Sequence, residues 1–210
     1  MRVLVFGASS IQGFWDTQGG WADRLKKHYD QQQFEDFTVE KPHVMNLGIS
    51  GDTTKELLVR IRIEAEARRN DKGISIVIQV GANNAAEENG RTRSTPEEYG
   101  ADLKKIIEEA LSLTNKVLVV GFQAVDEALT NPVAWRPIFY KNRNIKIFED
   151  TAAKVSSETN VKFVPVHDKY IEAMSGGQKL QAHDGLHPND DGHKLIFELV
   201  RPALDELLNV

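Results

Sequence analysis

Short apolar segments rich in β-branched residues alternate along the chain with longer amphipathic segments. The apolar segments are residues 3–6, 44–47, 74–80, 117–122 and 161–166. Their nearly continuous apolarity is typical of strands that are buried on both faces of a parallel sheet. The amphipathic segments, which we expect to be helices, span about residues 20–30, 53–69, 96–113, 138–158 and 190–208. This alternation predicts an α/β fold.

Three of the expected helices begin with residues that cap helix ends well. Thr95–Glu98 combines a capping hydroxyl, a proline at the first helical position and a reciprocal glutamate. Thr53–Glu56 repeats this box without the proline, and Asn189 precedes the last helix. Pro202 is expected to kink or end that last helix, because proline lacks an amide hydrogen.

Two longer segments, residues 85–95 and 123–137, show no clear periodicity. Each directly follows an expected strand, so in a doubly wound sheet both lie at the carboxyl edge, where ligands bind. Two interpretations stay open: the segments form a lid over a substrate, or they are variable surface connections.

The composition limits the class of protein. The chain has 210 residues, of which 40% are hydrophobic and 27% charged, and this balance predicts a single globular domain over residues 1–210. The net charge is −5 with both signs interspersed, which argues against a nucleic-acid partner. No apolar run is long enough for a membrane span. Nothing in the sequence indicates an oligomeric state.

The chain has no cysteine, which excludes disulfides, a thiol nucleophile and thiolate metal ligands. A nucleophile must therefore be sought among hydroxyl and carboxylate groups. Residues 1–6 are too short an apolar run for a signal-peptide core. Together with the absence of cysteine, this predicts a cytoplasmic location.

Candidate chemistry lies near both ends of the chain. The first strand runs into Gly7 and Ser9, where a strand-to-helix turn would display a hydroxyl. Asp184 and His187 are three residues apart in a loop, so one segment could supply a base and the carboxylate that orients it. Either segment alone is equally typical of an ordinary turn or helix cap.

Two further segments place hydrogen-bond donors at the same edge of the sheet. They are Asn46–Thr54, after the second strand, and Gln79–Asn84, after the third. Gly51 just precedes a capped helix, so its amide lies near the positive end of the helix dipole, and Asn83 offers a side-chain amide. With the amide of Ser9 they form a candidate oxyanion hole.

In order and spacing, these four segments resemble the conserved blocks of the SGNH, or GDSL-like, serine hydrolases over essentially the whole chain. The resemblance implies a flavodoxin-like three-layer α/β/α sandwich of about five parallel strands, with no metal or cofactor. It implies that Ser9, Asp184 and His187 are catalytic and that Ser9, Gly51 and Asn83 form the oxyanion hole. The implied substrate is a small-molecule carboxylic ester, for which a short acyl or acetyl group is our hypothesis, cleaved through an acyl-enzyme.

The resemblance has two departures beside the site. Ala8 and Asn84 stand where aspartates are common in the family. Both replacements remove negative charge and hydrogen-bonding capacity. They leave a non-catalytic ligand-binding module as one alternative, and an acyltransferase using the same residues is another.

Neighbouring residues offer rival interpretations. Ser10 is adjacent to Ser9 and chemically equivalent, although the family register favours Ser9. His183, His187 and His193 lie close together among carboxylates, a pattern that also suits a zinc site. The metal-free chemistry of the family argues against that site.

Aromatic residues follow both the first turn and the fourth strand. Trp15 and Trp21 are expected to pack the first helix, with the lining of an acyl pocket as the alternative. Trp135, Phe139 and Tyr140 fit an acyl pocket or a sugar-stacking surface as well as ordinary core packing.

Overall fold

A computed structural model describes residues 1–210 and has a central sheet of five parallel strands in the order β2-β1-β3-β6-β8. The strands are β1 (Arg2–Gly7), β2 (His43–Gly48), β3 (Ile74–Gln79), β6 (Val117–Val120) and β8 (Lys162–Val164). All four pairings are parallel. This is the strand order of flavodoxin-like sheets, so the predicted fold class is confirmed.

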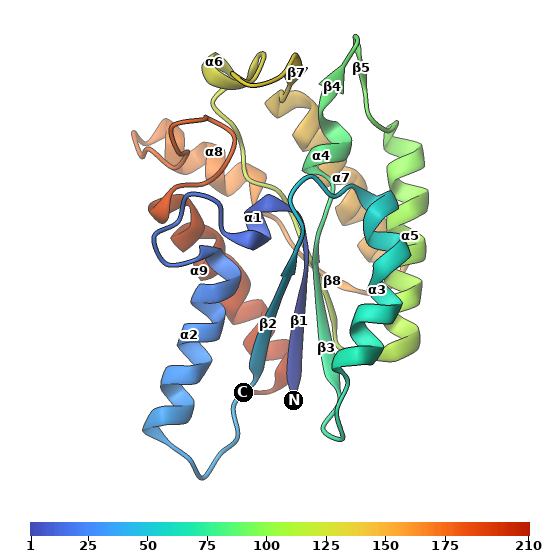
Figure 1. Cartoon of the computed structure of the whole chain (residues 1–210), viewed down its shortest axis with the longest axis vertical. Coiled ribbons are helices and arrows are strands. Elements are labelled where there is room, and N and C mark those ends of the chain that lie inside the picture. Colours follow the sequence, from blue (N-terminus) through green and yellow to red (C-terminus); the bar gives the residue numbers. More distant parts are fainter.

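Helices cover both faces of the sheet, because successive strand side chains point to opposite sides. In β1, Leu4 and Phe6 enter one core cluster, and Val3 and Val5 enter the other. The first cluster is covered by α3 (Thr54–Arg68), α5 (Pro96–Leu113) and α7 (Asn142–Glu158), and the second by α2 (Gly20–Glu35), α8 (His167–Ser175) and α9 (Asp190–Leu208). Figure 1 shows α2 and α9 on one side of the strands and α3 and α5 on the other. None of the helices combines the length and the apolarity needed to cross a membrane.

Short elements gather at the carboxyl edge of the sheet, shown at the top of Figure 1, and both chain termini lie at the opposite end. The elements are α1 (Ser9–Gln12), α4 (Ala82–Ala85), α6 (Glu127–Thr130) and a small antiparallel sheet of β5 (Arg91–Thr92), β4 (Glu87–Glu88) and β7 (Ile138–Phe139). In this small sheet, β4 and β5 come from the segment 85–95, whose periodicity is unclear. They are joined by β7, which directly follows the second such segment, 123–137.

The predicted start of the helix over 138–158 is wrong, because the first residues of that range belong to the small sheet. Ile138 and Phe139 pair with β4, so α7 begins only at Asn142. The nine-residue helix α8 was not predicted. It is short and buries few residues, so its local pattern is weak.

Pro202 does not end the last helix, because α9 continues past it to Leu208. The proline ring is exposed, whereas Val200, Leu204 and Leu208 on the same helix are buried in the core. Packing of this apolar face stabilises the last turns and offsets the hydrogen bond that proline cannot make.

Candidate active site

Ser9 lies at the carboxyl edge of the sheet, where β1 passes into α1 between β2 and β3. The approach depends on Gly7, because a Cβ there would lie only 2.2 Å from the carbonyl oxygen of Gln79. Any larger residue would push β1 away from β3 and displace the turn. As the first residue of a helix, Ser9 has an amide with no partner within the helix.

The side chains of Ser9, His187 and Asp184 form a continuous hydrogen-bonded chain. Ser9 Oγ lies 2.8 Å from His187 Nε2, and His187 Nδ1 lies 2.7 Å from Asp184 Oδ2. An ionised carboxylate only accepts hydrogen bonds, so Nδ1 carries the proton and Nε2 accepts from the serine hydroxyl. Both His187 and Asp184 are buried.

Asp184 accepts four hydrogen bonds. Its Oδ1 accepts from the amides of Leu186 (2.9 Å) and His187 (3.0 Å), and its Oδ2 accepts from the His187 ring and from the Trp15 indole N–H (2.6 Å). Burial by itself would raise the pKa of Asp184, but these hydrogen bonds and the neighbouring imidazole hold that pKa well below its usual range. The carboxylate is therefore ionised at neutral pH.

Trp15 is a member of this group that sequence reasoning missed. Its φ is 68°, in the left-handed region that bulky residues seldom adopt, and 52% of the residue is exposed. The ring packs against His183 with 4.9 Å between centroids. Trp21 is buried in the core as predicted, whereas Trp15 leaves the core and reaches Asp184. The expectation that Trp15 packs the first helix is wrong.

Asn83 and Gly51 lie on the other side of Ser9, and both line a pocket that opens there. Asn83 Nδ2 donates to the Asp52 carbonyl oxygen at 3.0 Å, and the Tyr140 hydroxyl donates to Asn83 Oδ1 at 2.9 Å. These contacts orient the amide and leave one Nδ2 hydrogen without a protein partner. Burial raises the pKa of Tyr140, so its hydroxyl keeps the proton that it donates.

Arg60 of α3, which the sequence analysis also did not identify, makes contacts to the backbone and to Asp52 near Gly51 and Asn83. Its guanidinium pairs with Asp52 at 2.7 Å and donates to the carbonyl oxygens of Leu47 (3.0 Å) and Gly7 (3.2 Å). One side chain thus connects the ends of β1 and β2 to the turn that carries Gly51. Gly51 has a φ of 88°, which glycine adopts without strain. The only sequence signal for Arg60 is its place beside Leu57 and Ile61, which are buried.

Residues 5–195 match the model of the GDSL-like lipase/acylhydrolase family. The chain belongs to this family. It is therefore an enzyme of the GDSL-like esterase and acylhydrolase type, as the sequence resemblance implies. Esterase TesA of Pseudomonas aeruginosa is 27% identical over 194 residues, which cover 92% of this chain and 82% of TesA.

Solved structures of similar proteins show the same fold. A crystal structure of TesA has a TM-score of 0.73 at 24% identity and covers 99% of both chains. A lipase/acylhydrolase from Enterococcus faecalis has a TM-score of 0.77 at 22% identity and covers 98% of this chain and 95% of its own. Axe2, an acetylxylan esterase from Geobacillus stearothermophilus, has a TM-score of 0.72 at 17% identity over 97% and 93% of the two chains.

The two departures from the GDSL-like pattern have different consequences. Asn84 is fully buried; its Nδ2 donates to the hydroxyls of Thr54 and Ser94, both at 2.9 Å, and its Oδ1 accepts from the Thr54 amide at 3.1 Å. The expectation that Asn84 loses hydrogen-bonding capacity is therefore wrong. Its side-chain amide makes hydrogen bonds that connect α4 to the start of α3. Ala8 precedes α1 without any side-chain cap, so the loss expected there is present.

The rival residues in this GDSL-like site have other partners. Ser10 Oγ accepts from Gln123 Nε2 at 2.9 Å, whereas Ser9 Oγ faces the imidazole. His193 is fully buried; its Nδ1 accepts from the Trp21 amide and its Nε2 donates to the Phe14 carbonyl oxygen, both at 3.2 Å.

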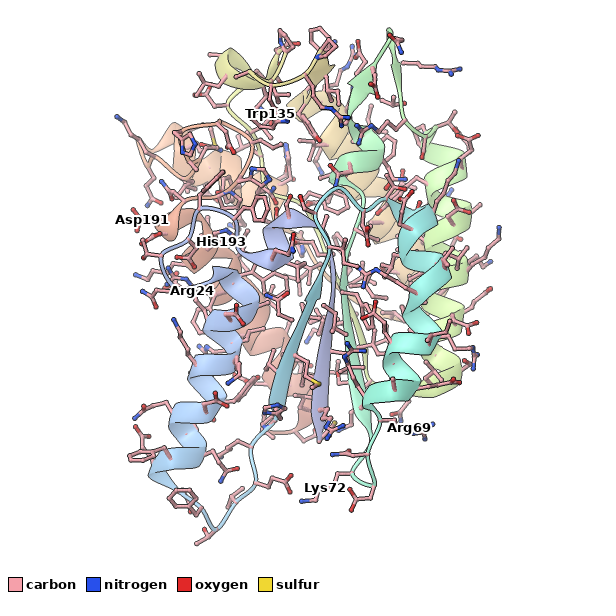
Figure 2. The ribbon with its side chains drawn as sticks, in the orientation of Figure 1. Arg24, Arg69, Lys72, Trp135, Asp191 and His193 are labelled. Carbon is pink, nitrogen blue, oxygen red and sulfur yellow. The ribbon has the colours of Figure 1, made fainter.

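Apart from the pair of Asp184 and His187, the histidines and carboxylates near the end of the chain do not converge. Figure 2 shows Asp191 at the outer margin of the molecule, and His193 lies inside it. No group of three or more histidine, cysteine or acidic side chains is placed to hold a metal ion. The structure thus does not assemble the cluster on which the zinc alternative depends.

Two pockets meet at Ser9 and His187. The inner pocket has a volume of about 30 Å³, and Phe122, just after β6, is among the residues that line it. The outer pocket has a volume of about 160 Å³ and is bordered by Trp135, which is 53% exposed and lies among the loops at the top of Figure 2. The buried hydroxyl of Tyr140 lines both. Two of the aromatic residues after the fourth strand, Trp135 and Tyr140, thus border the candidate site.

Proposed function

We propose that the protein is a serine hydrolase that cleaves carboxylic esters through Ser9, His187 and Asp184. The hydrogen-bonded chain from Ser9 Oγ through His187 to Asp184 is the observation that carries the proposal. It lies at the ligand-binding edge of an acylhydrolase fold. We further propose that the whole chain acts as one domain, because α9 contributes side chains to the same core cluster as Val3 and Val5 of β1.

In the first half of the proposed reaction, Ser9 Oγ attacks the carbonyl carbon of the ester while His187 Nε2 takes the hydroxyl proton. The ionised Asp184 stabilises the imidazolium that forms. The carbonyl oxygen becomes an oxyanion, which accepts hydrogen bonds from the amides of Ser9 and Gly51 and from the free Nδ2 hydrogen of Asn83. The bond between the carbonyl carbon and the alcohol oxygen then breaks, and the alcohol leaves with the proton from His187.

The second half repeats these steps with water. His187 takes a proton from a water molecule that attacks the acyl carbon of the acyl-enzyme, and the same donors hold the oxyanion. Collapse of the intermediate breaks the bond to Ser9 Oγ, which regains its proton from His187. The products are one carboxylic acid and one alcohol.

The inner pocket supports a preference for short acyl groups. The inner pocket, which Ser9 and Phe122 both line, has about 30 Å³ against about 160 Å³ in the outer pocket, and this small volume suits a short acyl group better than a long alkyl chain. An acetyl group that enters it places its carbonyl carbon beside Ser9 Oγ. We therefore propose acetyl and other short-acyl esters as substrates.

An assay with p-nitrophenyl esters of increasing chain length tests the proposal. We expect the highest kcat/KM with the acetate or its nearest homologues, and a decrease in kcat of roughly 10⁴-fold or more for Ser9→Ala. A fluorophosphonate probe should label the wild type and Ser10→Ala but not Ser9→Ala. Equal rates for wild type and Ser9→Ala would instead favour a non-catalytic binding module.

A further inference from the structure

The outer pocket carries positive charge that the proposed ester cleavage does not use. Arg93, between β5 and α5, and Arg136, between α6 and β7, both line it beside Ser9, and no aspartate or glutamate is among the lining residues. The chain as a whole has a net charge of −5. A cationic pocket at the reactive serine is therefore an exception on an acidic protein.

The positive charges of Arg93 and Arg136 both act on Tyr140, a polar residue that lines the pocket. Burial raises the pKa of Tyr140, and the positive charges of Arg93 and Arg136 each oppose that rise. The Tyr140 hydroxyl contacts Asn83, the candidate oxyanion donor, at 2.9 Å. The two guanidinium groups therefore lie close enough to the site for their field to reach it.

The two arginines differ in their pairing within the protein. Arg93 Nε lies 3.6 Å from a carboxylate oxygen of Glu88, and the Glu88 side chain is 43% exposed, so this ion pair is open to solvent. Arg136 is exposed and forms neither an ion pair nor a side-chain hydrogen bond. Its guanidinium group is therefore not engaged by another part of the protein. A guanidinium group that is free to pair is well suited to a ligand carboxylate or phosphate, which it binds through two parallel hydrogen bonds.

We propose that the outer pocket binds an anionic oxyacid group, carboxylate or phosphate, on the alcohol part of the ester. This inference rests on the proposed function and identifies its substrate class. The outer pocket, with about 160 Å³, is larger than the inner pocket, with about 30 Å³, so we place the alcohol part of the ester in the outer pocket. Trp135 borders that pocket and offers a flat apolar face to the carbon skeleton that carries the anion.

Three acetate esters with similar aromatic alcohols test this specificity. They are 4-acetoxybenzoate, 4-acetoxyphenyl phosphate and the neutral methyl 4-acetoxybenzoate. We expect the wild type to have a higher kcat/KM for at least one anionic ester than for the neutral one, mainly through a lower KM. Which anionic ester is preferred distinguishes carboxylate from phosphate, and raising the salt concentration should weaken the preference by screening.

Substitution of the arginines gives the decisive measurement. In Arg136→Gln the ratio of anionic to neutral kcat/KM should fall about tenfold, and it should fall further when Arg93→Gln is added. Arg91→Gln is the matched control, because it removes the same charge from the neighbouring β5 outside the outer pocket. The control should keep the wild-type ratio.

Binding of the product alcohol gives a readout that does not need turnover. Titration calorimetry of Ser9→Ala with 4-hydroxybenzoate and with its methyl ester should show tighter binding of the anion, and adding Arg136→Gln should reduce the difference. A wild type that shows no preference for either anion, or an Arg136→Gln variant with an unchanged ratio, would overturn the inference and leave ester hydrolysis intact. Failure of the wild type to hydrolyse any of the three esters would instead refute the proposed function.

Discussion

The two sides of Ser9 are built in different ways. On one side, Asp184 and His187 come from a single loop and contact each other within three residues of sequence. On the other side, Gly51 and Asn83 follow two different strands and meet only because β2 and β3 both lie beside β1. The acid–base side is thus encoded locally, and the donor side is encoded by the order and register of the sheet.

Each side nevertheless depends on a support from elsewhere in the chain. The acid–base side receives the indole N–H of Trp15, and the donor side is held by Arg60 and Asn84. The difference suggests that single substitutions act differently on the two sides. Removal of a donor should affect catalysis directly, whereas removal of a support should act through the position of its neighbours.

The largest expected effect is on the donor side. Asn83→Ala should lower kcat for p-nitrophenyl acetate by roughly 100- to 1,000-fold, about 2.7–4 kcal/mol of barrier, because one oxyanion donor is lost. Asn83→Asp is the matched control: its carboxylate can still accept from Tyr140 but cannot donate to an oxyanion, so it should lose as much activity. Activity within a few-fold of wild type in both variants would remove Asn83 from the oxyanion hole.

An effect of similar size is expected on the stability of the fold when the pH falls, through the buried His193 of α9. Burial lowers the pKa of His193 from 6.5 to about 4, so below pH 6.5 the unfolded chain binds a proton that the folded protein does not. The free energy of unfolding should therefore fall by about 3 kcal/mol between pH 7 and pH 4 through this group alone. Urea unfolding at several pH values measures it.

His193→Gln provides the comparison for that measurement. Glutamine offers an acceptor for Trp21 and a donor for Phe14, as the neutral imidazole does, but does not titrate. The variant should thus lose less stability on acidification than the wild type. His43→Gln, which removes an exposed imidazole, should behave like the wild type, and identical pH profiles for wild type and His193→Gln would contradict the assignment.

A smaller effect is expected from Trp15→Phe, which keeps the ring and removes the N–H bound to Asp184. We expect kcat to fall about tenfold with little change in KM, because a hydrogen bond to a charged group is lost. The pKa of Asp184 should rise, because the hydrogen bond from Trp15 is one of the contacts that lower it. Trp15→His, which retains a ring N–H, should recover part of the rate; no difference between the two variants would leave Trp15 with a packing role only.

The smallest effect is expected from Asn84→Asp, which restores the residue common in the family. The Thr54 amide and the hydroxyls of Thr54 and Ser94 can all donate to a carboxylate, so kcat should stay within roughly threefold of wild type. Asn84→Leu cannot accept from the Thr54 amide and should lower the free energy of unfolding by about 1–3 kcal/mol. A large loss of activity in Asn84→Asp would show that the two sides of Ser9 are more tightly coupled than the contacts indicate.

Periodicity and capping were sufficient to predict the five strands of the main sheet and its principal helices. The predicted bounds of α5 and α9 agree with the structure, and the capping boxes at Thr53 and Thr95 are both present. The small sheet was beyond such reasoning, because strands of two residues have no periodicity and β4 pairs with β7 some fifty residues further along the chain. The same long-range pairing moved the start of α7 to Asn142.

The candidate nucleophile, base, acid and oxyanion donors could all be named from the amino-acid sequence, because the four short segments that carry them together resemble the conserved blocks of the GDSL-like family. The supports and the cationic pocket could not. Trp15 and Asp184 are 169 residues apart, and Arg93 and Arg136 line one pocket from different loops. The hydrogen bond from Trp15 and the combined positive charge of the two arginines depend on distances between residues that lie far apart in the sequence. Only the folded chain establishes these distances, so no local pattern of residues encodes them.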